Sequence, residues 1–230
     1  MMRVDGLLFD KDGTLFDFGA TWNSWAARVI PDFAAGDDAL AQRIAHELDF
    51  DLRRGEFLPV SAIIAGTNRD AAEALARALP GRNVDELEET LMYAAAEAPL
   101  CEAVPLAPYL DGLAGRGLKL GVMTNDTEYG ARAHLDSVGV TARFDLVLGF
   151  DSGFGAKPEP GPLLAFCDRF ALPPERVAMV GDSTHDLVAG RRAGMQTVAV
   201  LTGMATEAEL APYADVVFPH IGHIPDWLDA

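Results

Sequence analysis

The stretch LLFDKDGTL, residues 7–15, decides how the rest of the chain is read, because an apolar run ends there in two acidic residues and a glycine. Residues 4–9 form a short, mostly apolar segment, which predicts a buried strand with Asp10 at its carboxyl end. In an open α/β sheet, ligands bind at the carboxyl ends of the strands, where the connecting loops diverge. Asp10 and Asp12 could hold a hard cation such as Mg²⁺ there, or one could attack phosphorus while the other moves a proton. Taken alone, the stretch fits an ordinary Asp-Gly turn equally well.

The composition is that of a globular protein and excludes several classes of partner. The chain has 230 residues, of which 50% are hydrophobic and 23% are charged, so we expect one or two folded domains. A net charge of −17 repels the phosphates of nucleic acids and anionic lipids, and we expect no nucleic-acid partner. No apolar run reaches the roughly 20 residues of a membrane span, and the start of the chain leaves no room for a signal peptide. We therefore expect a cytoplasmic protein that does not bind membranes.

Two patterns of apolar residues divide the chain. Between residues 21 and 97, Ala and Leu recur at three- and four-residue intervals, which predicts roughly four or five helices. We expect breaks between them at Pro31 and at residues 36–38, 54–55, 58–59, 66–67 and 80–81. From residue 105 onward, short apolar strands alternate with helices, which predicts a parallel sheet because each parallel crossover needs a long connection. The expected fold is a doubly wound, Rossmann-like α/β core of residues 1–18 and 104–230, with an all-helical cap domain of residues 19–103.

Polar residues follow the later strands of the predicted core at the point where each strand ends. One strand ends in Thr124 and Asn125, another in Asp182, and between them Lys157 precedes a proline that restricts the backbone. If the sheet is parallel, these residues meet Asp10 at one edge. Asp10 would then attack phosphorus, Asp182 and Asp10 would hold Mg²⁺, Thr124 would bind a phosphoryl oxygen, and Lys157 would neutralise developing charge.

Together these groups resemble the four signature motifs of the haloacid dehalogenase superfamily of phosphohydrolases. The matching elements are Asp10-x-Asp12-Gly13-Thr14, a strand ending in Thr124, Lys157 before a proline, and Gly181-Asp182-Ser183-x-x-Asp186. Their order matches throughout, and the helical insert is similar to the cap of the phosphoglycolate phosphatase-like branch. The resemblance implies a phosphatase with Mg²⁺ as its cofactor, a small phosphorylated metabolite as its substrate and an aspartyl-phosphate intermediate.

The resemblance also implies a role for each matching residue. Asp10 is the nucleophile, and Asp12 protonates the leaving group and then activates water. Mg²⁺ is held by Asp10, by the backbone carbonyl of Asp12 and by Asp182. Asp186 matches an acid that binds the metal directly or through water, although an acid at the start of a helix is also favoured by the helix dipole alone. Asn125 matches a position whose backbone amide contacts phosphate, while Thr124 could instead cap the next helix.

Other branches of the superfamily fit less well. The dehalogenase branch generally lacks the second aspartate of the first motif, so Asp12 favours phosphate chemistry. The phosphonatase branch uses a lysine of the cap, and residues 21–97 contain no lysine. A sugar phosphomutase would keep the same core residues and is the alternative, whereas a non-catalytic, partner-binding member would be expected to have lost Asp10, Asp12 or Lys157. We expect hydrolysis of a small phosphomonoester by a monomer or homodimer, with phosphoglycolate or a sugar phosphate as the first substrates to test.

Three further groups of residues have a structural and a functional interpretation. Phe18, Trp22 and Trp25 are expected to be cap core rather than a platform for substrate. Residues 53–54, both arginines, could bind an anionic tail of the substrate or lie in a solvated turn. His134 and the other histidines outside the last motif show no common spacing, which predicts packing or surface roles.

Overall fold

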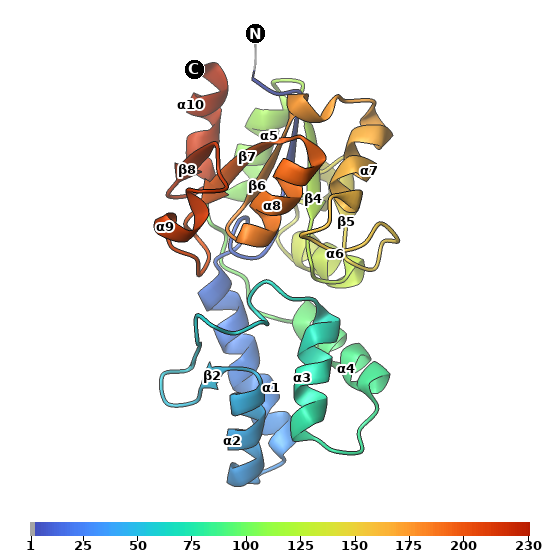
Figure 1. Cartoon of the computed structure of the whole chain (residues 1–230), viewed down its shortest axis with the longest axis vertical. Coiled ribbons are helices and arrows are strands. Elements are labelled where there is room, and N and C mark those ends of the chain that lie inside the picture. Colours follow the sequence, from blue (N-terminus) through green and yellow to red (C-terminus); the bar gives the residue numbers. More distant parts are fainter. Residues whose placement is uncertain (1–2) are drawn as a thin grey trace.

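The first strand, β1 (Gly6–Phe9), is fully buried, as predicted, and lies near the middle of a six-stranded sheet (Figure 1). The computed structural model describes residues 3–230. The strand order is β5-β4-β1-β6-β7-β8, and all neighbouring strands are parallel. The other strands are β4 (Lys119–Met123), β5 (Leu146–Leu148), β6 (Val177–Gly181), β7 (Gln196–Val200) and β8 (Val216–Phe218). The register pairs Phe9 with both Val122 and Val180, so the residues that follow β1, β4 and β6 emerge side by side.

Helices cover both faces of the sheet, because successive strand residues point to opposite sides. Leu7 and Phe9 belong to one apolar cluster, together with side chains from α5 (Leu106–Ala114), α6 (Glu128–Ser137) and α10 (Ile224–Asp229). Leu8 belongs to another, together with side chains from α7 (Gly161–Phe170) and α8 (Thr184–Ala193). The doubly wound α/β core is confirmed. The short elements η2 (Thr141–Arg143), η3 (Pro174–Arg176), α9 (Glu207–Leu210) and η4 (Ile221–His223) complete it.

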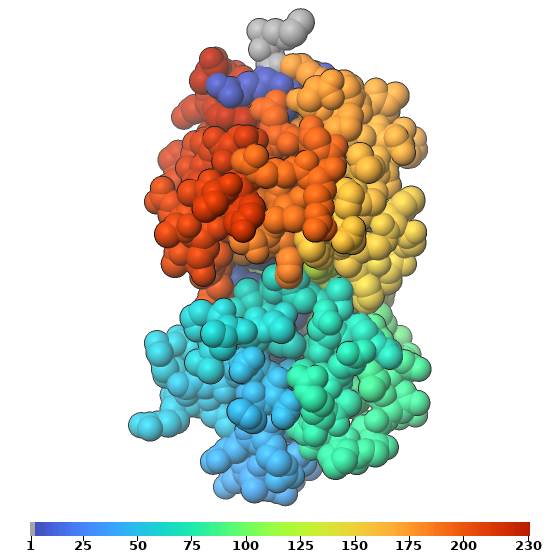
Figure 2. All heavy atoms as spheres, viewed as in Figure 1, coloured from blue at the N-terminus to red at the C-terminus, as the bar shows by residue number. Residues whose placement is uncertain are grey.

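The segment between β1 and α5 forms a helical lobe of its own. It contains one π-helical turn, η1 (Gly19–Asn23), and the helices α1 (Ser24–Ala34), α2 (Asp38–Glu47), α3 (Asn68–Ala78) and α4 (Val84–Ala96). Their apolar faces share one cluster, which includes Trp25, Ile30, Ile44, Leu75 and Leu91. Figure 2 shows this lobe, coloured from light blue to green, in contact with the core along one side, and Figure 1 shows that it lies beyond one end of the core. The helical insert is therefore confirmed.

Two details of the insert differ from the prediction. The insert is not purely helical, because β2 (Phe50–Asp51) and β3 (Glu56–Phe57) form a short antiparallel pair around the turn that was predicted as a simple helix break. The break predicted at Pro31 is wrong, because α1 continues through it to Ala34. Proline removes one backbone donor but keeps its carbonyl, and the Ala35 N–H still donates to the Pro31 carbonyl at 3.0 Å.

The chain passes between core and insert at two places. Phe16 packs in the core cluster and Phe18 in that of the insert; on the return path Ala98 belongs to the insert cluster and Leu100 packs against the core. The division into a core of residues 1–18 and 104–230 and a cap of residues 19–103 stays a prediction that agrees with these crossings, and residues 1 and 2 lie outside the described part. Among residues 3–230, no helix combines the length and the apolar character needed to cross a membrane.

Candidate active site

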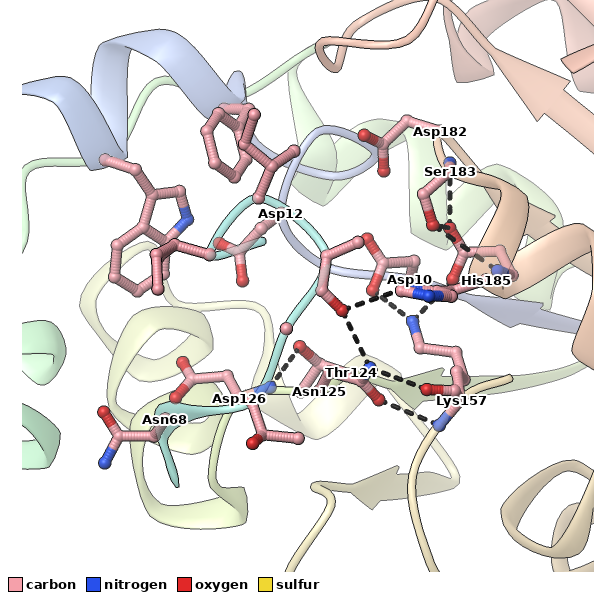
Figure 3. A pocket seen from close by; sticks show the side chains of 18 of the residues that line it. Asp10, Asp12, Asn68, Thr124, Asn125, Asp126, Lys157, Asp182, Ser183 and His185 are labelled. Atoms are coloured by element: carbon pink, nitrogen blue, oxygen red, sulfur yellow. Dashed lines mark hydrogen bonds and ion pairs between the residues drawn. The ribbon is translucent and has the colours of Figure 1, made fainter. Parts of the chain in front are cut away.

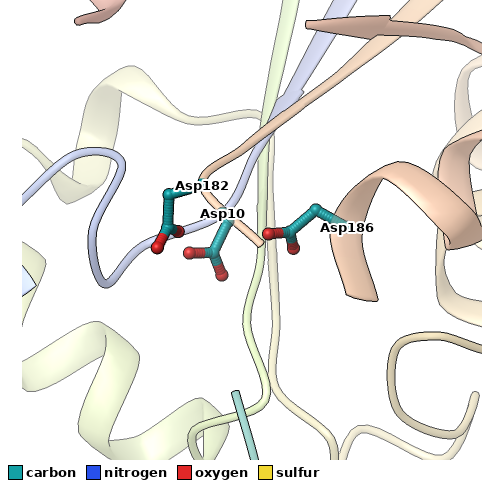
Figure 4. A group of neighbouring side chains, drawn as sticks. All are labelled: Asp10, Asp182 and Asp186. Atoms are coloured by element: carbon teal, nitrogen blue, oxygen red, sulfur yellow. The ribbon is translucent and has the colours of Figure 1, made fainter. Parts of the chain in front are cut away.

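Three acidic residues meet at the carboxyl ends of β1 and β6 (Figure 4). Asp10 follows β1, Asp182 follows β6, and Asp186 lies in the first turn of α8. One carboxylate oxygen from each lies within 4.8 Å of the others. The three residues are only 6%, 4% and 1% exposed, respectively. Buried carboxylates this close repel one another unless a cation or protons offset their charge, so the cluster is a candidate metal centre.

The start of α8 explains how Asp186 is positioned. Ser183 and Asp186 form a capping box, in which the Ser183 backbone N–H donates to Asp186 Oδ2 at 3.0 Å and the Ser183 hydroxyl donates to the same oxygen at 2.7 Å. The other oxygen, Oδ1, lies 2.6 Å from Lys157 Nζ. The helix-capping interpretation of Asp186 therefore describes one of its oxygens, and the other faces the site.

The turn after β1 packs directly on Asp182. Gly13 has a φ of 82°, and a side chain there would collide with the Asp182 carboxylate. Thr14 Oγ1 donates to Asp182 Oδ1 at 3.2 Å, and the Thr202 hydroxyl donates to the Gly13 carbonyl at 2.6 Å. Glycine is needed here for both its positive φ and its missing side chain.

Lys157 lies among these acids with 5% of its surface exposed. Its ammonium group is 2.5 Å from Asp10 Oδ1 and also donates to the Met123 carbonyl at 2.9 Å, in addition to its contact with Asp186. Asn125 clamps the lysine backbone on both sides, since its Oδ1 accepts from the Lys157 N–H and its Nδ2 donates to the Lys157 carbonyl, each at 2.9 Å. The Asn125 amide also donates to the carbonyl of Ala65 in the insert at 3.0 Å.

Thr124 does not cap the next helix. The N-cap of α6 is Thr127, whose hydroxyl accepts from the Gly130 N–H at 3.0 Å. The Thr124 hydroxyl instead accepts from the Asp126 N–H at 3.1 Å, and the residue is 2% exposed. Its side chain is thus oriented by the strand-end turn rather than by the helix.

Burial dominates the protonation of the acidic cluster. It raises the pKa of Asp10 to about 7; Lys157 opposes this shift, and the charges of Asp186 and Asp12 add to it. Burial, followed by the charges of Asp10 and Asp186, raises the pKa of Asp182 well above its usual range. Burial alone would lower the pKa of Lys157, but the two carboxylates outweigh it and raise this pKa. The charged cluster carries more negative than positive charge, which a divalent cation would balance.

A second buried network, which the sequence analysis missed, holds Asp12. Lys11 has no exposed surface, and its ammonium group lies 2.6 Å from Asp12 Oδ2, 3.2 Å from Asp126 Oδ2 and 2.9 Å from His134 Nδ1. No described residue donates a hydrogen bond to Asp126 Oδ2, so its partner is the charge of Lys11. One sequence signal pointed to this network: Lys11 is one of only three lysines and stands between two acids at the end of a buried strand.

His134 completes this network and connects it to the insert. Its Nε2 lies 2.7 Å from the carbonyl of Ala95, which can only accept, so Nε2 carries the proton. Nδ1 is then free to accept from Lys11. Burial, followed by the charge of Lys11, lowers the pKa of His134, which keeps the ring neutral. His134 is a packing residue, as one of its two interpretations predicted, but it packs on the site.

One cavity between core and insert contains all seven residues that the sequence singled out as site residues (Figure 3). They are Asp10, Asp12, Thr124, Asn125, Lys157, Asp182 and Asp186. The cavity measures about 700 Å³, including its open mouth. Its insert side is formed mainly by Phe18, Trp22, Trp25 and residues 63–68. The prediction for the three aromatic residues was incomplete, because they line the cavity as well as pack in the insert.

The two arginines at residues 53–54 are not among the residues that line this cavity. They lie in the exposed turn between β2 and β3, where Arg54 pairs with Glu56 at 2.6 Å. The solvated-turn interpretation therefore describes them. His185, which does line the cavity, places its Nδ1 3.1 Å from the Ala65 carbonyl.

Comparison with known proteins agrees with this geometry. A family model described as haloacid dehalogenase-like hydrolase matches residues 4–194. The phosphoglycolate phosphatase of Rhodospirillum rubrum is 31% identical over 226 residues, which cover 96% of this chain and 90% of that protein. The N-acetylmuramic acid 6-phosphate phosphatase of Pseudomonas aeruginosa is 31% identical over 238 residues, which cover 99% of this chain and 96% of that protein.

Solved structures show the same fold. A haloacid dehalogenase-like hydrolase from Bacteroides fragilis has a TM-score of 0.71 at 22% identity, covering 96% of this chain and all of that one. A protein from Haemophilus somnus described as a predicted phosphoglycolate phosphatase has a TM-score of 0.69 at 22% identity, and the match covers 99% of both chains. From its motifs, its fold and the family model, the chain belongs to the haloacid dehalogenase-like hydrolases.

Proposed function

We propose that this protein is a Mg²⁺-dependent phosphatase that hydrolyses a small phosphomonoester through a phosphoenzyme on Asp10. The observation that carries the proposal is the placement of Asp10, which touches Lys157 at 2.5 Å and shares a buried cluster with Asp182 and Asp186. A nucleophilic carboxylate, a fixed cation and a divalent metal site side by side are what phosphoryl transfer needs. The curated relatives named phosphatases support the same reaction class.

The donor set fits Mg²⁺. Its three potential side-chain donors are carboxylate oxygens, and all three are buried at the edge of the sheet. Asp10, Asp182 and the Asp12 carbonyl would hold the ion, and Asp186 would contribute through its Oδ1, which it shares with Lys157. Bound there, Mg²⁺ would polarise the phosphoryl group and balance the negative charge of the cluster.

The first half of the reaction uses Asp10 and Asp12. An Asp10 oxygen attacks phosphorus, the bond from phosphorus to the leaving oxygen breaks, and Asp12 gives that oxygen a proton so that the product leaves as an alcohol. Lys157, fixed by Asn125, stabilises the charge on the transferring phosphoryl group, to which Thr124 and the Asn125 backbone donate hydrogen bonds.

The second half regenerates the enzyme. Asp12 takes a proton from a water molecule, the resulting hydroxide attacks phosphorus, and the bond to Asp10 breaks to release inorganic phosphate. Both Asp12 oxygens face the Lys11 ammonium, at 2.8 and 2.6 Å, which orients the side chain. Asp12 enters the first step as the protonated acid and the second step as the carboxylate. The Asp12 side chain keeps 14% exposure, so substrate and water can reach it.

The test is phosphate release from a panel of phosphomonoesters, with Mg²⁺ and with EDTA. Asp10→Asn should abolish release, and brief incubation of the wild type with ³²P-labelled substrate should leave a hydroxylamine-sensitive label that this variant lacks. Asp136→Asn is the matched control, because Asp136 is an exposed aspartate on α6. Substantial turnover by Asp10→Asn would refute the covalent mechanism. Transfer of phosphate to another hydroxyl of the substrate, without release, would show a phosphomutase instead.

A further inference from the structure

Aromatic and aliphatic side chains form the insert side of the cavity, which is called the tryptophan wall below. Phe18, Trp22 and Trp25 come from the segment that enters the insert, and Ile63 and Ile64 come from the loop before α3. The Trp22 and Trp25 rings meet edge to face with their centroids 5.5 Å apart. The centroid of the Phe18 ring lies 6.5 Å from that of the Trp22 ring. These contacts hold the rings in place and leave a preformed apolar surface beside the catalytic cluster.

The polar side of the cavity is strongly acidic. Five carboxylates line it, from Asp10, Asp12, Asp126, Asp182 and Asp186. The two buried ammonium groups nearby are already paired, Lys157 with Asp10 and Asp186 and Lys11 with Asp12 and Asp126. Figure 3 shows the Lys157 side chain ending beside Asp10, with Asn68 on the opposite side of the view. The lining also includes Thr67, Asn68 and His185, but its only lysine or arginine is Lys157, so a second anionic group on the substrate would find no free ammonium or guanidinium group to balance its charge.

Two hydrogen-bond donors on the wall are unpaired. The indole N–H groups of Trp22 and Trp25 are buried and have no hydrogen-bond partner in residues 3–230. Trp25 is 2% exposed, so an unpaired N–H there is costly. Both N–H groups lack accessible surface, so a neutral acceptor on a bound molecule, such as a hydroxyl, ether or carbonyl oxygen, would pair with one only after a small shift of the ring.

Building on the proposed phosphatase function, we propose that the alcohol released by this enzyme is uncharged and binds through an apolar, preferably aromatic, face. The phosphate of such a substrate lies on the acidic cluster with Lys157, and the organic part packs on the tryptophan wall. Phosphoglycolate, whose released alcohol carries a carboxylate, is then a poor substrate despite the names of some relatives.

The test compares benzyl phosphate with 4-carboxybenzyl phosphate, which release similar primary alcohols and differ in one carboxylate. With Mg²⁺, kcat/KM should be about tenfold or more higher for benzyl phosphate, the size of effect that one pocket contact typically has on specificity. Phosphoglycolate should fall with the carboxylated compound. If 4-carboxybenzyl phosphate and phosphoglycolate are turned over as fast as benzyl phosphate or faster, this inference is wrong, while the proposed phosphatase activity still holds. Absence of phosphate release from every compound would refute the phosphatase proposal itself.

Variants of the wall make the test specific. Ile64→Lys adds a cation inside the cavity and should narrow or reverse the preference for benzyl phosphate. Val60→Lys adds the same charge on the same loop, at a residue that is 78% exposed and outside the cavity, and should keep the wild-type ratio. Trp22→Leu should raise the KM for benzyl phosphate more than it lowers kcat. Inhibition by inorganic phosphate, which needs only the acidic cluster and Lys157, reports that each variant still has a folded site; an unchanged ratio in Ile64→Lys would refute the inference.

Discussion

Replacing Lys11 with methionine removes a fully buried ammonium group and keeps an unbranched side chain of similar length. In the wild type that group pairs with Asp12 and Asp126 and donates to His134 Nδ1. The Asp126 side chain is only 6% exposed, so it would stay buried without its counter-charge. Breaking a buried pair by removing one partner typically costs about 3–5 kcal/mol. For a chain of this length each kcal/mol corresponds to about 2–4 °C, so we expect the melting temperature to fall by roughly 6–20 °C.

The same substitution should slow catalysis. Both Asp12 oxygens lose the contact that orients them, and general acid–base catalysis is worth about 10²–10⁴-fold. We expect kcat to fall by a sizeable part of that factor, with little change in KM because Lys11 is not among the residues that line the cavity. Urea unfolding and steady-state kinetics of the same preparations measure the two effects.

Two further variants separate charge from packing. Lys119→Met removes a lysine that is 46% exposed and pairs with Asp145 on the surface, and should cost at most about 1 kcal/mol. Lys11→Met combined with Asp126→Asn removes the unpaired charge, so it should recover part of the stability but not the kcat. If Lys11→Met unfolds at the same urea concentration as the wild type, or if the double variant regains full activity, the interpretation of this network is wrong.

Four other predictions concern the proposed metal site and the insert. Gly13→Ala should abolish turnover and the thermal stabilisation by Mg²⁺, because the residue has a φ of 82° and its side chain would collide with Asp182; a variant that keeps a wild-type Mg²⁺ response would contradict the role of this contact. Mg²⁺ should bind more weakly at pH 6 than at pH 8 by calorimetry, because the pKa of Asp10 is raised to about 7 and the ion competes with protons there. Without metal, the stability of the fold should change with pH in the opposite direction. Because the pKa of Asp10 is higher in the folded than in the unfolded protein, the folded state gains stability as pH falls from about 7 to the unfolded pKa. Melting curves in EDTA measure this gain. Arg54→Ala should leave kcat/KM unchanged in the phosphate-release assay, because its side chain is 69% exposed and pairs with Glu56; a large loss would place it at the site.

The sequence by itself determined the α/β core and singled out seven of the residues that line its cavity. Strand and helix periods are local, and parallel topology places strand ends at one edge, so Asp10, Thr124 and Asp182 could be grouped without coordinates. The short β2–β3 pair was missed because two-residue strands leave no period to detect. Helix α1 continues past Pro31 because backbone hydrogen bonds on either side of the proline keep the helix geometry. The rule that a proline ends a helix does not take these bonds into account.

Only the tertiary structure decided what each side chain meets. Lys11 and His134 are 123 residues apart, and their contact exists because β1 and α6 pack in one core. The tryptophan wall lines the cavity because the insert folds back over the edge of the sheet, a placement that no local pattern in residues 19–103 encodes. A sequence pattern reports which face of an element is apolar; burial, charge pairing and the second wall of a cavity depend on segments far away along the chain.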